Sequence, residues 1–309
     1  MKFIIFFSKL FLDAIRDTYK IIKYFDLVKI NGHVVILKLF MIGFFYAFPI
    51  IRNLKKKNLN LSNIEVDANK SLNDLCNRGY TEIAQLKKEI FIDIKNEVLA
   101  NESNIVLKKK TFDGLIYKQK NETLSQYLDR LKKNNVSRIS GSLNIEKCSA
   151  LKRLIISKDI IDIASKYINS KRLSINVSYF ISLPVKTSES EKYKNAQYFH
   201  WDNDFTKFLK LYIYLSDVDE GSGPHVYIEG THKSKRFEHS LTRLYSDEEI
   251  YESYPNIKKF YGESGSFFFT DSYGLHKGEV PVTSPRIMLN IHFGSNKIKY
   301  HANDKILIL

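Results

Sequence analysis

A histidine and an aspartate stand two positions apart in the segment AQYFHWDNDF, as His200 and Asp202. If this segment is a β-strand, both side chains emerge on the same face and can converge on one metal ion. A neutral imidazole with a carboxylate suits Fe(II), Mn(II) or Zn(II), and two histidines with one carboxylate leave three octahedral positions open. A single His-x-Asp pair arises easily by chance, so a third ligand from another strand is needed.

His276 is the best candidate for this third ligand. It lies in FFFTDSYGLHKGEV, where one strand ends in a Gly-containing turn, and Arg286 follows ten residues later at the start of RIMLNIHF. In this last strand the apolar residues Ile287, Leu289, Ile291 and Phe293 share one face, and Arg286, Met288, Asn290 and His292 share the other. We expect the apolar face to be covered by helices, which turns Arg286 into the interior. A dicarboxylate bound there would remove the cost of burying an unpaired guanidinium.

The chain from Ala196 to Phe293 resembles the phytanoyl-CoA dioxygenase-like branch of the Fe(II)/2-oxoglutarate-dependent oxygenases. The residues that carry the resemblance are AQYFHWDND, FLKLYIYLSDVDEGSGPHVYIEGTHK and GSFFFTDSYGLHKGEVPVTSPRIMLNIHF. The resemblance implies a double-stranded β-helix, or jelly-roll, core. It also implies that His200, Asp202 and His276 bind iron, and that Arg286 holds the distal carboxylate of 2-oxoglutarate.

The activity implied by this resemblance is a dioxygenase reaction that needs Fe(II), 2-oxoglutarate and O2. A small or conjugated metabolite would be hydroxylated with release of succinate and CO2, with no catalytic residue beyond the metal centre. Asp202 favours hydroxylation or desaturation, because relatives that halogenate carry a small residue at this position. Lys210 lies on the next predicted strand and is either a second cation for 2-oxoglutarate or a solvated strand lysine.

Three further histidines lie near these strands. His225 and His232 are seven residues apart around one predicted strand and would allow a second metal site. Turn capping or a substrate contact is the preferred interpretation for both. His292 shares the inward face with Arg286, and we expect it to be an ordinary core histidine.

The elements that must position these residues change type along the chain. From residue 58 to about 171, apolar residues recur every three or four positions, as in YTEIAQLKKEIFIDIKNEVLA and CSALKRLIISKDIIDIASKYI, which predicts helices. From Leu173 onward, short β-branched and aromatic runs predict strands: LSINVSYFISL, AQYFHWD, FLKLYIYLSDV, HVYIEGTH, GSFFFTDS and PRIMLNIHFG. This order predicts an α+β fold, a β-sandwich or jelly roll braced by N-terminal helices. The acidic segment SDEEIYESY from Ser246 predicts an exposed helix that could act as a lid.

The first 57 residues form a separate segment in this interpretation, followed by one oxygenase domain over residues 58–309. Residues 3–25 predict an amphipathic helix, residues 39–51 are uninterruptedly apolar but short of a membrane span, and a basic cluster follows directly. The segment has 11 Lys and Arg against three acidic residues, a net charge of +8. It either contacts an anionic membrane surface peripherally or packs on the following domain. A catalytically silent jelly-roll binding module at a membrane is therefore the alternative function.

The charge and cysteine content narrow the class of protein further. The chain of 309 residues has a net charge of +14, which on its own would suggest a nucleic-acid partner. Residues 196–293, however, contain ten Lys and Arg against 14 Asp and Glu, a net of −4, so the remaining chain carries +18. We therefore expect a small-molecule substrate and no nucleic acid. Cys76 and Cys148 suit neither a disulfide framework nor a zinc site, which favours a reducing cytoplasmic location, with the inner face of a membrane as an option.

Overall fold

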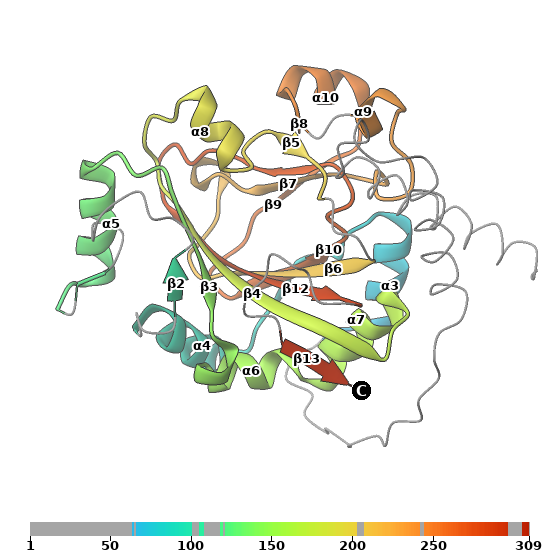
Figure 1. Ribbon diagram of the computed structural model, residues 1–309, viewed down its shortest axis with the longest axis horizontal. Helices are drawn as coiled ribbons and strands as arrows, with labels where there is room; N and C mark the ends of the chain where they lie inside the picture. The colour runs from blue at the N-terminus through green and yellow to red at the C-terminus, as the bar shows by residue number, and fades with distance from the viewer. Residues whose placement is uncertain are drawn as a thin grey trace, which may run out of the picture. The chain divides into compact units, whose positions relative to one another are not determined.

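The computed structural model describes Ile64 and residues 66–100, 105–107, 118–119, 121–202, 207–241, 244–295 and 305–308. Residues 1–57 lie outside this part of the chain, so the amphipathic helix and the membrane contact remain predictions. The described residues form helices and two antiparallel sheets (Figure 1), which confirms the predicted α+β class. No helix among them is long and apolar enough to cross a membrane.

The two sheets are built entirely from antiparallel pairings among the described strands. The larger sheet has the order β1-β10-β6-β12-β4-β3-β2, with β13 beside β4. Its strands are β1 (Ala84–Gln85), β2 (Ile105–Leu107), β3 (Arg138–Leu143), β4 (Arg172–Ser182), β6 (Phe208–Tyr214), β10 (Ser266–Thr270), β12 (Arg286–Gly294) and β13 (Lys305–Ile308). The smaller sheet has the order β8-β5-β11-β7-β9. Its strands are β5 (Phe199–His200), β7 (His225–Ile228), β8 (Leu244–Tyr245), β9 (Ile257–Phe260) and β11 (His276–Gly278).

The helices lie around these sheets. They are α3 (Ala68–Asn77), α4 (Lys88–Ala100), α5 (Leu124–Lys133), α6 (Ser149–Ile155), α7 (Lys158–Ile168), α8 (Glu189–Lys194), α9 (Glu238–Leu241) and α10 (Asp247–Ser253), with short 3-10 turns at Ile145–Lys147 and Glu220–Ser222. Figure 1 shows α4, α6 and α7 on the side of the larger sheet that faces away from the smaller sheet. Helices from the first half of the described chain therefore brace the larger sheet, as the sequence predicts.

The two faces of β12 differ as the sequence predicts. Ile287, Leu289, Ile291 and Phe293 are each 2% exposed or less. Met288, on the opposite face, packs in one cluster with Tyr227 and Phe260 of the smaller sheet. Because Arg286 is two residues from Met288, it shares this inward face. The guanidinium of Arg286 is thus directed into the space between the sheets.

Aromatic side chains join the two sheets at one end. The rings of Phe260 on β9 and Phe268 on β10 stack with centroids 4.0 Å apart, and the Tyr214 hydroxyl donates to the Phe260 carbonyl at 2.9 Å. Both phenylalanines are fully buried. Burial of each such ring stabilises the fold by roughly 1.5–3 kcal/mol. This cluster fixes the sheets against each other, and the chemistry-bearing side chains lie on the same inner surfaces.

The structure differs from the sequence prediction in the stretch expected to be helical. Strand β3 lies in it, and its sequence RISGSL hides the strand because two serines and a glycine stand in a row between its two apolar side chains, Ile139 and Leu143. The helical pattern over residues 148–168 forms two helices, since Ser157 is the N-cap of α7 directly after α6 ends. Strand β5 is short because the Asp202 N–H donates to the Ser272 carbonyl at 2.8 Å instead of continuing a ladder.

Candidate metal centre

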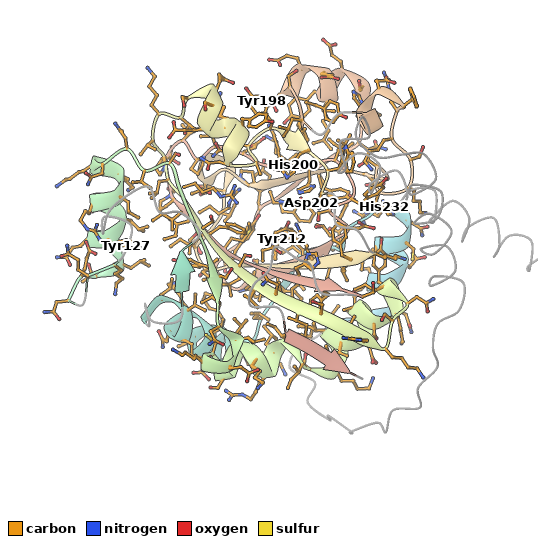
Figure 2. The ribbon with its side chains drawn as sticks, in the orientation of Figure 1. Tyr127, Tyr198, His200, Asp202, Tyr212 and His232 are labelled. Carbon is orange, nitrogen blue, oxygen red and sulfur yellow. The ribbon has the colours of Figure 1, made fainter. Side chains whose placement is uncertain are left out.

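The structure brings His200, Asp202 and His276 together. His200 ends β5 and pairs directly with His276 at the start of β11. Asp202 lies two residues after His200, just beyond the end of β5, so its side chain meets those of the two paired histidines. One ligand atom from each lies within 4.8 Å of the others, and the described residues contain no other such group. Figure 2 shows His200 and Asp202 between the two sheets, near Tyr212 of the larger sheet.

The hydrogen bonds of the two histidines fix which nitrogen is available to a ligand. Nδ1 of His200 lies 2.9 Å from the Tyr198 carbonyl oxygen, and Nδ1 of His276 lies 3.0 Å from the Gly274 carbonyl oxygen. A carbonyl only accepts hydrogen bonds, so each Nδ1 carries the proton and each neutral ring keeps its lone pair on Nε2. This arrangement of a backbone acceptor behind the ring is typical of metal-binding histidines.

The distances between these atoms suit a divalent cation. Nε2 of His276 lies 3.5 Å from one oxygen of Asp202, and Nε2 of His200 lies 4.0 Å from the other. Both distances are longer than a good hydrogen bond. Ligands at right angles around an ion with bonds of about 2.1 Å lie roughly 3 Å apart, so only a small contraction is needed. Two nitrogen lone pairs and a carboxylate therefore converge on one point.

Lys210 lies on β6 and contacts this group. Its ammonium donates a hydrogen bond to the Asp202 carboxylate, and the Lys210 side chain is 12% exposed. Lys210 is therefore part of the interior and not a solvated strand lysine. The predicted contact between Lys210 and 2-oxoglutarate stays a prediction, because the structure places its ammonium on the carboxylate of the candidate metal centre.

The guanidinium of Arg286 is buried without an anionic partner in the described structure. Its Nε and Nη1 make no hydrogen bond, and the residue is 5% exposed. A Cβ on Gly278 would lie only 2.5 Å from Arg286 Nη2, so the glycine makes room for the guanidinium. Gly278 is two residues from His276 and shares its face, which places the cation roughly 7 Å along β11 from the candidate ligand.

His225 lies between these groups, and the sequence analysis did not single it out for this position. On β7 it pairs with Gly278, and its ring centroid is 5.5 Å from that of His276 and 4.7 Å from that of Tyr212. Its Nε2 is buried without a partner. Burial, and then the neighbouring His276 and the Arg286 guanidinium, hold the pKa of His225 well below its ordinary value. His225 is therefore a neutral ring beside the guanidinium.

The other predicted histidines and the acidic helix have separate places. Nε2 of His232 lies 3.3 Å from the Cys76 carbonyl, and no metal-ligating group of the described residues includes it or His225. The ring of His292 stacks on Phe208 at 5.3 Å, as expected of a core histidine. Helix α10 pairs through Asp247 with Lys277, whose side chain leaves β11 opposite to that of His276. The helix therefore covers the outside of the smaller sheet and is not a lid over the interior.

No family model and no curated protein matches this chain. Among solved structures it resembles HygX from Streptomyces hygroscopicus with nickel and 2-oxoglutarate bound, at 11% identity, with 72% of this chain and 85% of HygX covered and a TM-score of 0.46. It resembles the non-heme alpha ketoglutarate dependent carbocyclase SnoK from nogalamycin biosynthesis at 15% identity, with coverage of 76% and 84% and a TM-score of 0.48. EctD from S. alaskensis with bound Fe has 12% identity, coverage of 80% and 82%, and a TM-score of 0.47. At such identities and scores, the chemistry of this chain is decided by its own side chains.

Proposed function

We propose that the protein is an Fe(II)- and 2-oxoglutarate-dependent dioxygenase of the phytanoyl-CoA dioxygenase-like kind, which hydroxylates a small or conjugated metabolite. The observation that carries this proposal is the pairing of two features on one strand. His276, with His200 and Asp202, offers a three-ligand metal site, and two residues along β11 the unpartnered Arg286 guanidinium lies against Gly278.

The residues present fit both Fe(II) and 2-oxoglutarate. Two imidazole lone pairs and one carboxylate are the donor set that non-haem Fe(II) takes, with open positions left for other ligands. The buried Nε and Nη1 of Arg286 have no protein acceptor, and a carboxylate satisfies such a fork in a bidentate way. A short dicarboxylate that chelated the metal at one end would have its other carboxylate on the side of Arg286. 2-Oxoglutarate has this shape and also the keto group needed for chelation.

The strand order supports a double-stranded β-helix core for this proposal. From β4 to β12, consecutive strands β4, β5, β6 and β7 alternate between the larger and smaller sheets. After β9, which also lies in the smaller sheet, β10, β11 and β12 alternate again. Two antiparallel sheets connected in this way are the arrangement of a jelly roll.

The protein's own residues have distinct tasks in this reaction. Iron with 2-oxoglutarate and O2 supplies the oxidation, in which the cosubstrate becomes succinate and CO2 and one oxygen atom enters a C–H bond of the metabolite. Tyr198 and Gly274 hold the histidine rings through their carbonyls, so each Nε2 stays directed at the metal. Arg286 orients the cosubstrate from its distal end. Asp202 would supply a carboxylate ligand where relatives that halogenate carry a small residue, which favours hydroxylation or desaturation.

Succinate formation tests this proposal. The full chain with Fe(II), 2-oxoglutarate and O2 is expected to form succinate slowly without a substrate and faster with a suitable metabolite. His200→Ala and Arg286→Ala should each abolish this reaction, whereas Arg172→Met, which removes an exposed arginine from β4, should not. A folded wild-type chain that binds iron and 2-oxoglutarate but never forms succinate with any metabolite contradicts the proposal.

A further inference from the structure

A second arginine, Arg138 on β3, faces the same interior. It pairs with Ser182 on β4, which in turn pairs with Arg286 on β12. Directly paired residues of neighbouring strands share a face, so both guanidinium groups start from the inward side of the larger sheet. The sequence analysis missed Arg138 because β3 lies in the stretch that reads as helical.

Arg138 has no anionic partner among the described residues. Its Nε is buried without a hydrogen bond, and it forms no ion pair with a described carboxylate. Burial, and then the guanidinium of Arg286, lower the pKa of Arg138 to about 10. At neutral pH the inward side of the larger sheet therefore carries two arginine cations, on strands separated only by β4. Such an arrangement is costly unless anions enter it.

The two guanidinium groups are directed at different places. That of Arg286 lies against Gly278 of the smaller sheet, whereas Arg138 Cζ lies 4.5 Å from the Phe180 ring centroid on the larger sheet. Arg138 is also partly exposed, whereas Arg286 is buried. A small carboxylate bound to Arg286 would lie against β11. It would not reach the part of the interior beside β4, where the Arg138 guanidinium lies.

The inner face between Arg138 and the candidate metal centre is polar except for the apolar pair Met288 and Phe180. The inward residues of β12 and β4 form four successive cross-strand pairs, or rungs: Arg286 with Ser182, Met288 with Phe180, Asn290 with Ser178, and His292 with Asn176. On the other side of β12, Lys210 of β6 pairs with His292. Because Lys210 forms an ion pair with Asp202, the His292 end of β12 is the end near the candidate metal centre. The Phe180 rung therefore lies between Arg286 and the candidate metal centre. Oδ1 of Asn290 on the next rung is buried without a partner. An anion on Arg138 would thus lie beside the cosubstrate, on a surface suited to a polar molecule.

We propose that Arg138 binds an acidic group, a carboxylate or phosphate oxyanion, of the metabolite that is oxidised. This inference rests on the proposed function and deepens it, since it names the chemical class of the substrate. Arg286 serves the cosubstrate and Arg138 serves the substrate. The stacked Phe180 ring holds the Arg138 guanidinium in place.

Calorimetry with sulfate as the probe tests this division. Sulfate is titrated into the full chain loaded with Mn(II) and saturated with 2-oxoglutarate, so that Arg286 is occupied. The wild-type chain is expected to bind one sulfate, and Arg138→Met should weaken this binding about tenfold or more, because a hydrogen-bonded charge is lost. Arg138→Lys, which keeps the charge, should retain part of the affinity. Arg172→Met, which removes an exposed arginine of β4, should bind sulfate as the wild-type chain does.

The affinity for 2-oxoglutarate separates this inference from its alternatives. Arg138→Met should bind 2-oxoglutarate within about twofold of the wild-type chain, whereas Arg286→Met should not. If Arg138→Met loses 2-oxoglutarate as Arg286→Met does, both arginines hold one carboxylate and the inference is wrong. It is also wrong if sulfate binds Arg138→Met unchanged, or does not bind the wild-type chain that holds 2-oxoglutarate. A wild-type chain that binds no 2-oxoglutarate with Mn(II) overturns the proposed function itself.

Acidic metabolites provide the second arm of the test. A panel of carboxylic acids and phosphate esters is compared with the matching amides and free alcohols for stimulation of succinate formation. The acids should stimulate the wild-type and Arg172→Met chains and not Arg138→Met. Stimulation by a neutral metabolite that is equal in wild-type and Arg138→Met chains counts against an acidic substrate.

Discussion

At the scale of single residues, Gly278 decides whether the Arg286 guanidinium has room in its present position. The guanidinium occupies the space in which a side chain at position 278 would begin, 2.5 Å from Nη2. The two residues therefore act as a pair, although they lie on different sheets. Neither spacing nor residue type reveals this from the sequence, because a glycine near a strand end is ordinary.

Gly278→Ala is expected to weaken 2-oxoglutarate binding about tenfold or more, since the added methyl group displaces the guanidinium from its charged hydrogen bonds. Calorimetry on the Mn(II)-loaded chain measures this. The affinity for Mn(II) is the internal control and should change less than about twofold, because the three candidate ligands are untouched. Gly278→Ala with unchanged 2-oxoglutarate affinity would show that the cosubstrate does not use Arg286 in this position.

Residue types and spacing predicted much of the candidate site. His200 and Asp202 followed from period-two alternation, and His276 and Arg286 from their places at strand ends, and the structure brings the first three together. Arg138 and His225 could not be found in this way. Their roles depend on which strands are neighbours, and β3 beside β4 or β7 beside β11 is a property of the sheet order.

At the scale of elements, α10 holds the strands that carry both candidate histidine ligands. Lys277, which follows His276, is 4% exposed and donates to Asp247 at 2.6 Å, and its ammonium lies 4.8 Å from the ring centroid of Phe199, next to His200. The outer side of β5 and β11 thus depends on a helix formed by an acidic segment. The ion pair between Asp247 and Lys277 thus helps to keep the two candidate histidine ligands in place.

Asp247→Asn is expected to lower the free energy of unfolding by about 1 kcal/mol and to weaken Mn(II) binding, because Lys277 is left buried with a poorer partner. Glu248→Gln is the matched control, since it also removes one acidic residue from the first turn of α10 and Glu248 is exposed. Urea unfolding and calorimetry measure the two effects. Equal effects of both variants would mean that only the helix dipole is involved.

His232 links β7 to α3 and makes stability depend on pH. Its Nδ1 is buried without a partner, and burial lowers the pKa of His232 below its ordinary value. Below pH about 6.5 the unfolded chain takes up a proton that the folded chain does not, so stability falls as pH falls, by up to about 1.4 kcal/mol per pH unit for this group.

His232→Gln removes this titration. Its stability is expected to change less than that of the wild-type chain between about pH 7.5 and about pH 5.5, measured by urea unfolding at both values. The comparison uses the pH dependence and not the absolute stability, so a general loss of packing does not affect it. Identical pH dependence in the two chains would exclude a neutral His232 in the folded state.

The long strands were predicted more completely than the short ones. Strands β4, β6 and β12 have clear β-branched and aromatic runs, and each appears close to its expected bounds. Strands β8 and β11, of two and three residues, are too short for a periodic signal, yet β11 carries His276. Their extent depends on the neighbouring strands, which the local sequence does not contain.

At the scale of the whole molecule, the segment that carries the candidate metal centre and the N-terminal segment differ in the sign of their net charge. Residues 196–293 carry a net charge of −4, while residues 1–57 carry +8. The basic excess therefore lies away from the candidate metal centre in the sequence. The boundary after residue 57 and the membrane contact of the first segment remain predictions from composition.

Deleting residues 1–57 is expected to release the protein from anionic liposomes, while the full chain binds them in a way that weakens with salt. Sedimentation with anionic and with neutral liposomes at low and high salt measures this. The truncated chain should still bind Mn(II) with the affinity of the full chain. A full chain that stays in the supernatant with anionic liposomes at low salt would favour packing of the segment on the domain.

The central claim is that one metal and one 2-oxoglutarate bind together at His200, Asp202, His276 and Arg286. Anaerobic calorimetry of 2-oxoglutarate binding, with and without Mn(II), tests it most directly. We predict one 2-oxoglutarate per chain that binds only when Mn(II) is present, with loss of metal binding in His276→Ala and loss of 2-oxoglutarate binding alone in Arg286→Ala. A folded wild-type chain that binds no Mn(II), or that binds 2-oxoglutarate equally well without it, would contradict the claim.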